Sequence, residues 1–292
     1  MRRIHEIGLI ANPEKPQWKE HLTRAVALIT GAGRSPFAPQ LDAGYEATEG
    51  GTQSLPPLIA QIAKTDLILV IGGDGTMLGV ARSLMGNSTP ILGINTGNLG
   101  FLTAAPMPEL DSVLQAIWSD DFRIHTRPFI EGVIRKTTGD EHFVALNDFV
   151  ISRGEVSRMI QLDVSVDGDF LTTYQCDGLI VCSPTGSTAY SLSAGGPIVS
   201  PRTPAITLTP ICPHALSNRS VIVPLDSVIN VDVGSHPQGT ILTADGQVPT
   251  PLEPGDNVQF QRSQHEFTLL SVSNHSFFQT LRQKMKWSGS NV

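Results

Sequence analysis

Up to about residue 103, the chain alternates between continuous apolar runs and stretches in which apolar residues recur every three or four positions. Continuous runs predict strands that are buried on both faces, and the recurring pattern predicts amphipathic helices. This alternation is typical of a parallel α/β sheet. The predicted strands are Ile4–Ile10, Asp66–Ile71 and Ile91–Ile94, and the predicted helices are Gln17–Ile29, Leu55–Ala63, Met77–Leu84 and Glu109–Ser119.

The pattern changes after the last of these helices. Short β-rich segments follow one another, separated by turn residues such as Asp167-Gly168 and Gly255-Asp256. Such a pattern predicts an all-β domain, either a sandwich or a compact barrel. The tail His275–Trp287 again has a helical pattern, and it could return to the α/β half. The predicted β segments are Phe129–Arg135, His142–Ser152, Ile160–Val166, Leu179–Val181, Ser220–Val223, Val228–Val233 and Val258–Gln261.

Charge and cysteine content narrow the possible functions. The net charge of −7 argues against broad binding of nucleic acid or of anionic membranes, which would need a basic surface. The sequence has no apolar run long enough to span a membrane, and its N-terminus lacks the apolar segment of a signal peptide. Cys176, Cys182 and Cys212 lack CxxC spacing, so we interpret them as buried thiols rather than disulfides or zinc ligands. These features together predict a cytoplasmic protein with neither nucleic acid nor membrane as a partner.

The first candidate for phosphate chemistry is Gly72-Gly73-Asp74-Gly75-Thr76, which lies between a predicted strand and a predicted helix. Open α/β sheets bind ligands at the carboxyl ends of their strands, where glycines let backbone N–H groups approach phosphate oxygens. The following helix N-terminus adds favourable partial charge. Because the loop matches neither GxxxxGK nor GxGxxG, its spacing fits a tight turn with a capping Asp equally well. A bare carboxylate repels phosphate, so Asp74 favours a metal or general-base role.

Two further loops have a composition suited to binding a polar ligand. The segment Asn95–Phe101 follows the strand Ile91–Ile94, again at a carboxyl end. The segment Asp177–Pro197 is rich in Ser, Thr and Gly and contains Tyr190. Hydroxyl groups and backbone amides can satisfy a polar, uncharged ligand surface such as ribose, nicotinamide or phosphate oxygens. The alternative is an irregular loop whose hydroxyls cap its own backbone, but its length and glycine density favour binding.

Other polar positions leave two interpretations open. Asn147 and Asp148 lie in an apolar β-rich stretch, so they must either bind a ligand or hold the domain together. Asp245-Gly246 can be a plain hairpin turn, and Gln247 on its own is weak evidence for a function there. His214 has no partner spacing for nucleophilic catalysis, and a structural role suits it better. The remaining histidines show no metal-ligand spacing.

In this order along the chain, the motifs resemble those of bacterial NAD kinases. GGDGT alone also occurs in lipid kinases and phosphofructokinases, whereas the run Thr185–Ser193 with the preceding Asp-Gly pair is specific. The resemblance implies an α/β N-terminal domain with a Rossmann-like parallel sheet over 1–110, joined by the returning tail 274–292. It implies an all-β C-terminal sandwich domain over 111–273. The matching motifs are Gly72–Thr76, Gly93–Leu102, Asn147-Asp148, Asp177–Ser193, Pro213–Ser217 and Asp245–Gln247.

The same resemblance implies a reaction, in which the γ-phosphoryl group of ATP passes to the 2′-hydroxyl of the adenosine ribose of NAD, giving NADP. Asp74 would be the general base, and Asn147 with Asp148 would bind the adenosine part of NAD. Asp177 and the Thr188–Ser193 loop would hold ribose and nicotinamide. The implied phosphate cradle is Gly72, Gly73, Gly75, Thr76 and Asn95, and the implied NAD-binding residues are Asp74, Gly75, Asn147, Asp148, Arg158, Gln175, Asp177, Thr188, Ala189, Tyr190, Ser191, Leu192, Ser193 and Gln247.

Three positions depart from the family pattern. Gln175 stands where close relatives often carry arginine, and Arg158 stands where some carry histidine. Asp148 replaces the more usual Glu of an Asn-Glu pair. Its side chain is shorter by one methylene, so we expect a longer or water-mediated contact.

Phosphoryl transfer of this kind uses an Asp to orient the hydroxyl and Mg²⁺ to bridge the ATP phosphates. Because the chain has no Walker lysine, we expect Mg²⁺ or another divalent metal, with no direct protein ligand assigned, and backbone amides to neutralise the phosphates. The family also implies a homotetramer, a dimer of dimers, in which residues near Tyr190 complete a neighbouring subunit's site.

Two alternative functions remain at this stage. A kinase of the same loop type acting on a lipid or sugar would fit Gly72–Thr76, but the Thr185–Ser193 loop suits it poorly. A dinucleotide-binding sensor without catalysis would be expected to lack Asp74 or the glycines around it, and all of these are present.

Overall fold

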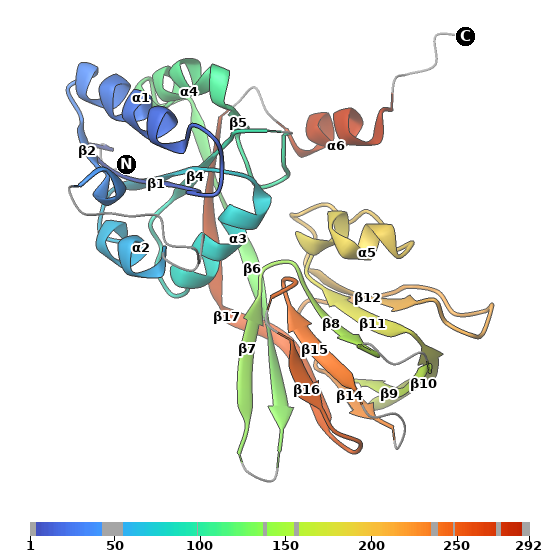
Figure 1. Ribbon diagram of the computed structural model, residues 1–292. Coiled ribbons are helices and arrows are strands. Elements are labelled where there is room, and N and C mark those ends of the chain that lie inside the picture. Colours follow the sequence, from blue (N-terminus) through green and yellow to red (C-terminus); the bar gives the residue numbers. More distant parts are fainter. Residues whose placement is uncertain are drawn as a thin grey trace, which may run out of the picture. The chain divides into compact units, whose positions relative to one another are not determined.

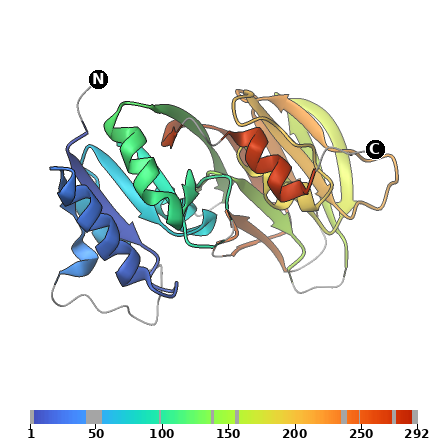
Figure 2. The same cartoon turned by 90° about the horizontal axis from the view of Figure 1, so that it is seen from above.

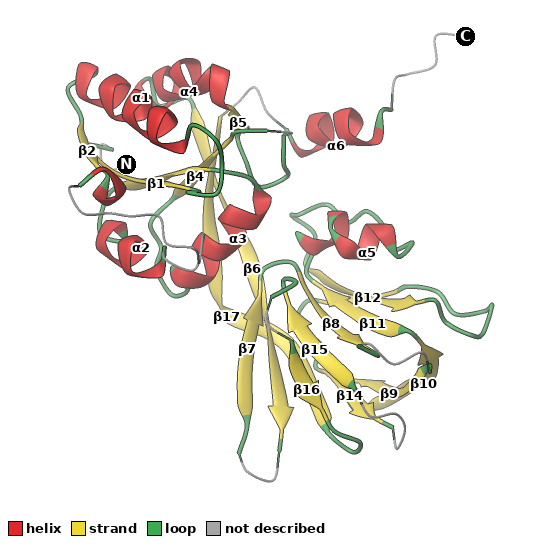
Figure 3. Cartoon of the chain, viewed as in Figure 1, coloured by secondary structure: helices red, strands yellow, loops and turns green. Residues whose placement is uncertain are grey.

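The computed structural model describes residues 4–42, 55–97, 99–136, 139–154, 158–234, 239–247, 249–272 and 276–287. Asn98 in the third motif and His275 in the predicted tail helix lie outside the described residues. The chain divides into two compact units, Met1–Thr126 with Phe267–Val292, and Arg127–Glu266. The first unit is α/β and the second is largely β, as the hydrophobic pattern predicts (Figures 1 and 3).

A parallel sheet forms the centre of the first unit. Strand β1 pairs in parallel with β2 and β3, and β3 pairs in parallel with β4. The short strand β5 and the end of β17 also pair in parallel with β4. The five residues of β3 and the five of β4 are all buried, which explains their unbroken apolar sequence. The strands are β1 (Glu6–Ala11), β2 (Ser35–Phe37), β3 (Leu67–Ile71), β4 (Ile91–Asn95), β5 (Ala105–Pro106) and β17 (Asn257–Val272).

Helices cover both faces of this sheet. On one face α1 (Trp18–Gly31) and α4 (Leu110–Trp118) pack side by side, as Figures 1 and 2 show. Helix α1 buries Ala25 against the sheet, whereas the neighbouring Val26 is only partly buried. On the other face lie α2 (Pro56–Ile62) and α3 (Asp74–Ser83). A Cβ at Gly8 of β1 would lie 2.6 Å from the Cβ of Ile62, so the glycine lets α2 pack closely.

The second unit consists of two sheets with one apolar core between them. The core joins Phe149 from one sheet to Phe260 from the other, with ring centroids 5.1 Å apart. The first sheet has the order β13-β12-β11-β8-β15-β16, and the second contains β10-β9-β14-β17, with β6 paired to β17 and β7. The remaining strands are β6 (Phe122–Arg135), β7 (Glu141–Ala145), β8 (Asp148–Ser152), β9 (Ile160–Val166), β10 (Asp169–Cys176), β11 (Gly178–Cys182), β12 (Ala205–Ile211), β13 (Val221–Pro224), β14 (Ile229–Val233), β15 (Thr240–Ala244) and β16 (Thr250–Leu252).

Two Asp-Gly pairs make tight turns in this unit. Asp167 and Gly168 both have positive φ, 53° and 89°, and so do Asp245 and Gly246, at 49° and 66°. Positive φ at both central residues defines a type I′ turn, which suits the twist of a two-residue hairpin. Asp245-Gly246 therefore forms a tight turn, in which the N–H of Gln247 donates to the Ala244 carbonyl at 3.0 Å.

Several segments differ from their sequence-based predictions. The single predicted segment His142–Ser152 is two strands, β7 and β8, with a break at Leu146-Asn147. Strand β17 (Asn257–Val272) extends well beyond the predicted segment Val258–Gln261. The prediction was too short because polar residues interrupt the apolar pattern of the strand. Helix α4 belongs to the first unit, whereas a boundary at 110/111 would leave it in the second.

The tail is helical, as its pattern predicts, and the three cysteines are free. The tail forms α6 (Phe277–Met285), whose N-cap Ser276 accepts a hydrogen bond from the backbone N–H of Gln279. Cys176 and Cys182 are free and buried as expected, but Cys212 is free and exposed, so its prediction as a buried thiol was wrong. Among the helices that the structure describes, none is long and apolar enough to cross a membrane.

Candidate functional site

The Asp74 side chain lies at the start of α3, not in the preceding loop. The helix begins at Asp74, three residues before the predicted start at Met77, and the preceding Gly73 is its N-cap. One oxygen of the carboxylate accepts the backbone N–H of Phe101 at 2.9 Å, and the other accepts that of Leu102 at 3.1 Å. Two backbone donors from the loop after β4 therefore fix the orientation of this carboxylate.

Glycines make this close approach possible. A Cβ at Gly100 would overlap the carboxylate of Asp74, so only glycine lets the loop come this near. A Cβ at Gly72 would lie 2.5 Å from the hydroxyl of Thr76, which itself accepts a hydrogen bond from the Asn12 amide at 3.0 Å. Gly72 and Thr76 thus pack on each other beneath the helix start, rather than opening toward solvent.

A pocket of about 230 Å³ lies beside Asp74, at the carboxyl ends of β1, β3 and β4. Of the predicted cradle, Gly73 and Asn95 line it, whereas Gly72, Gly75 and Thr76 do not. The side chain of Asn95 accepts the N–H of Gly97 at 2.6 Å and shapes the wall. Two cations that line this pocket, Lys15 and Lys284, were not indicated by the sequence. The lining residues are Lys15, Gly73, Asp74, Asn95, Thr96, Gly97, Gly100 and Lys284.

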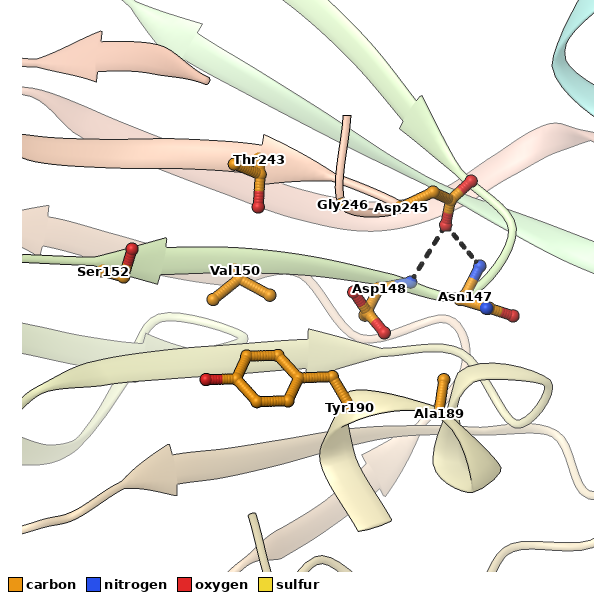
Figure 4. A pocket seen from close by; sticks show the side chains of 9 residues that line it. All are labelled: Asn147, Asp148, Val150, Ser152, Ala189, Tyr190, Thr243, Asp245 and Gly246. Atoms are coloured by element: carbon orange, nitrogen blue, oxygen red, sulfur yellow. Dashed lines mark hydrogen bonds between the residues drawn. The ribbon is translucent and has the colours of Figure 1, made fainter. Parts of the chain in front are cut away.

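A second pocket, of about 400 Å³, lies in the β unit (Figure 4). It lies between strand β8 and the end of β15 on one side and the short helix α5 (Tyr190–Ser193) on the other. It brings together four of the residues that the family resemblance assigns to NAD, namely Asn147, Asp148, Ala189 and Tyr190. The lining residues are Asn147, Asp148, Val150, Ser152, Ala189, Tyr190, Thr243, Asp245 and Gly246.

Asp245 organises this pocket through the backbone. Its carboxylate accepts the N–H groups of Leu146 at 3.1 Å, Asn147 at 2.7 Å and Asp148 at 3.3 Å. These bonds occupy the backbone donors at the break between β7 and β8. On the other side, a Cβ at Gly186 would overlap the backbone of Asn147, so the loop at Gly186 packs directly on this break. The sequence marked Asp245 as a motif position or a hairpin turn, but it did not indicate that its carboxylate holds the backbone of residues 146–148.

The Asp148 carboxyl is buried in the pocket wall, with only 5% of the residue exposed. Burial and, to a smaller extent, the nearby Asp245 carboxylate together raise the pKa of this carboxyl from 3.8 to about 7. Asp148 therefore changes charge near neutral pH, and its ionised form would gain most from a ligand that donates hydrogen bonds.

Residues of the Thr188–Ser193 loop differ in what they contact. Tyr190 is 48% exposed and lies over the pocket with its ring (Figure 4). Ser191 is buried, and its hydroxyl shares a 3.0 Å hydrogen bond with that of Thr209, which anchors the loop. The hydroxyl of Thr188 donates to the Thr185 carbonyl. Thr188, Ser191, Leu192 and Ser193 do not line the pocket.

The other predicted residues also lie outside the pocket lining. Asp177 accepts a 3.1 Å ion-pair contact from the Arg153 side chain, and both are about one-third exposed. Gln175 is exposed, and its carbonyl accepts the N–H of His214 at 2.8 Å. Arg158 and Gln247 are exposed as well. Arg153, which the sequence did not single out, is thus the side chain that holds Asp177.

Two protein-family models match this chain. The model of the ATP-NAD kinase N-terminal domain matches residues 51–122, and that of the ATP-NAD kinase C-terminal domain matches residues 146–272. The NAD kinase of Solibacter usitatus is 41% identical over 286 residues, which cover 97% of this chain and 98% of that protein. The NAD kinase of Geobacter sulfurreducens is 38% identical and covers 97% of this chain and 99% of its own length.

Solved structures agree with this similarity. Yeast NADH kinase complexed with NADH superimposes with a TM-score of 0.84 and 27% identity, covering 100% of this chain and 90% of that one. The NAD kinase from Archaeoglobus fulgidus in complex with ATP shares the fold, with a TM-score of 0.73, 23% identity and coverage of 97% and 100%. The motifs, the fold and the full-length relatives agree, and the chain belongs to the NAD kinase family, the phosphotransferases that convert ATP and NAD to ADP and NADP.

Proposed function

We propose that this chain transfers the γ-phosphoryl group of ATP to the 2′-hydroxyl of the adenosine ribose of NAD, with Asp74 as the general base. Membership of the NAD kinase family supports the reaction. One observation supports the role of Asp74 above all others. Its carboxylate is fixed by the N–H groups of Phe101 and Leu102 beside a pocket walled by glycines.

The geometry of the carboxylate suits a base. An ionised carboxylate has about four lone-pair sites, and the two backbone N–H groups occupy two of them. A remaining site accepts the proton of the 2′-hydroxyl, while the hydroxyl oxygen forms a bond to the γ-phosphorus. The bond from that phosphorus to the bridging oxygen breaks, and its electron pair leaves with ADP. A general base contributes roughly 10²–10⁴-fold, so alignment and charge neutralisation must supply the remainder.

The donor atoms near Asp74 suit a magnesium ion that arrives with ATP. The structure describes no group of three or more His, Cys, Asp or Glu side chains that could hold a metal. Among the described residues that line its pocket, Asp74 carries the one carboxylate. Mg²⁺ usually keeps several waters and binds through one or two carboxylates plus substrate phosphates, so this environment fits it. When bound, the ion would neutralise charge on the phosphates. Gly73 and Asn95 would contribute to the phosphate cradle, with Gly72, Gly75 and Thr76 as its support.

The pocket in the β unit is the proposed site for the adenosine part of NAD. Asn147 and Asp148 present polar groups there, and the exposed ring of Tyr190 offers an apolar face. The family resemblance assigns the ribose and nicotinamide to Asp177 and the Thr188–Ser193 loop, with Arg158, Gln175 and Gln247 nearby. The exposure of Gln175 and the access of solvent to Asp177 are compatible with that assignment.

We also propose that the enzyme works in the cytoplasm. All three cysteines are free, including the exposed Cys212. Free thiols persist in reducing compartments, whereas secreted proteins usually pair them.

Replacing Asp74 with asparagine tests the proposed base. Asp74→Asn keeps the size and one hydrogen-bond acceptor but cannot take the hydroxyl proton, so we expect turnover to fall by about 10²-fold or more. Affinity for NAD should stay within about threefold of the wild type, since the adenosine pocket is untouched. Coupled assay with an NADP-specific dehydrogenase measures the turnover.

The matched control is Asp111→Asn, which changes an exposed Asp in the first turn of α4 in the same unit. It should leave turnover unchanged. If Asp74→Asn kept more than about one-third of wild-type turnover, the general-base assignment would be wrong.

The raised pKa of Asp148 predicts that NAD binding depends on pH. Adenosine offers hydroxyl and amine donors, which an ionised carboxylate accepts. In the protein without NAD, the pKa of the Asp148 carboxyl is about 7. Below that pH the carboxyl must lose a proton before it can accept hydrogen bonds from NAD. The KM for NAD should therefore fall as pH rises from 5.5, by up to about tenfold per unit, and level off above pH 8. Steady-state kinetics across this range measures it.

Asp148→Asn removes the titrating group and should make the KM for NAD nearly independent of pH between 5.5 and 8. A wild-type KM that rose with pH would show that Asp148 binds NAD as a neutral donor. An identical pH profile in the variant would show that another group is responsible.

We propose that the active form is a homotetramer, a dimer of dimers. Large apolar side chains of the β unit are exposed, among them Phe170 at 69% and Leu216 at 92%. Apolar exposure on this scale favours burial against another subunit. Light scattering should therefore report a multiple of the 31.3 kDa chain mass, and specific activity should fall on dilution below the assembly constant. A fully active monomer at assay concentration would refute the proposal.

A further inference from the structure

Two lysines from distant parts of the sequence line the pocket beside Asp74. Lys15 follows strand β1, and Lys284 lies near the end of helix α6. Neither forms an ion pair with any residue that the structure describes. Against them the pocket lining presents one carboxylate, that of Asp74. The pocket therefore holds an excess of positive side-chain charge.

Lys15 is tied to the start of α3 through Asn12. The Asn12 side-chain oxygen accepts the N–H of Glu14 at 2.9 Å, and its backbone carbonyl accepts that of Lys15 at 3.1 Å. The Asn12 side-chain amide donates to the Thr76 hydroxyl at 3.0 Å. Thr76 lies in the same helical turn as Asp74. The turn that carries Lys15 is thus anchored to the helix start beside the pocket.

Lys284 is tied to the same place through Phe101. Its ammonium nitrogen lies 5.3 Å from the centroid of the Phe101 ring, within the range of a cation–π contact. The ring of Phe277, at the start of α6, lies 5.8 Å from that of Phe101. The backbone N–H of Phe101 is one of the two donors that hold Asp74. Helix α6 therefore packs against the residue that orients the carboxylate.

The rest of the lining offers little bulk. Gly73, Gly97 and Gly100 expose backbone rather than side chains, and Gly73 is the N-cap of the ten-residue helix α3. The start of helix α3 and two ammonium groups together match a ligand that carries several negative charges on small oxygens. A triphosphate has this chemistry.

We propose that Lys15 and Lys284 bind the triphosphate of ATP, and that α6 is consequently part of the phosphoryl-donor site. This inference rests on the proposed function. When the bond between the γ-phosphorus and the bridging oxygen breaks, the electron pair remains on ADP, and the two ammonium groups stabilise the negative charge that develops there. They supply the side-chain cations that the sequence, lacking a GxxxxGK motif, gave no reason to expect.

The test uses Lys284→Met and Lys15→Met in the full-length protein. Methionine keeps an unbranched side chain of similar length, so the contact of residue 284 with Phe101 remains while the charge is lost. Each variant should raise the KM for ATP by about tenfold to a hundredfold, the range expected for a lost charge-assisted hydrogen bond. The KM for NAD should stay within about threefold. Calorimetric titration with ATP, with and without Mg²⁺, should show the same weakening independently of turnover.

Matched controls remove the same charge nearby. Arg282→Met lies on the same helix, about 200° around it from Lys284, and Lys19→Met lies on the first turn of α1. Both should leave the KM and the Kd for ATP unchanged. Lys284→Arg, which keeps the charge, should recover most of the affinity that Lys284→Met loses.

Three outcomes would overturn the inference. The KM and Kd for ATP could stay within about threefold in both methionine variants. The KM for NAD could rise instead, which would place the lysines at the dinucleotide. Arg282→Met could weaken ATP as much as Lys284→Met, which would indicate only a general effect of charge. If wild-type protein bound ATP but formed no NADP, the proposed reaction would fail, while the binding titrations would still decide the role of the lysines.

Discussion

The carboxylate of Asp74 and the backbone N–H groups of Phe101 and Leu102 form the contact on which the candidate site depends. It joins the helix after β3 to the loop after β4, and these two strands are neighbours in the parallel sheet. The contact requires glycine at position 100, because any side chain there would overlap the carboxylate. A glycine-rich motif that looks like a phosphate loop therefore has a second purpose, which is to bring backbone donors up to an acid.

The β unit uses the same device at Asp245, whose carboxylate accepts three consecutive backbone N–H groups at the break between β7 and β8. There the held residues, Asn147 and Asp148, form part of the pocket wall. Burial raises the pKa of the Asp148 carboxyl, and the charge of the nearby Asp245 carboxylate, which holds the backbone, adds to this shift. Positioning and charge are thus coupled in the proposed adenosine pocket.

The sequence predicts some of these features well and others not at all. The strands β3 and β4 are continuous apolar runs, so their burial follows from composition. Strand β17 mixes Gln, Arg, His and Glu with apolar residues, and its length depends on pairing that no local pattern reveals. The motifs indicate Asp74, Asn147 and Asp148. The pairing of Asp245 with residues almost a hundred positions away, and the meeting of Lys15 with Lys284, arise only from the tertiary fold.

The central claim is that Gly100 lets the loop hold Asp74 in the orientation needed for phosphoryl transfer. Turnover of Gly100→Ala tests it most directly, with Gly79→Ala as the control, because a Cβ at Gly79 of the same helix meets nothing within 4 Å. We expect Gly100→Ala, shown to be folded by circular dichroism, to form NADP about 10²-fold more slowly, because its general base is displaced. The control should keep wild-type turnover. A Gly100→Ala enzyme with more than about one-third of wild-type turnover would show that glycine at position 100 is not needed to orient Asp74.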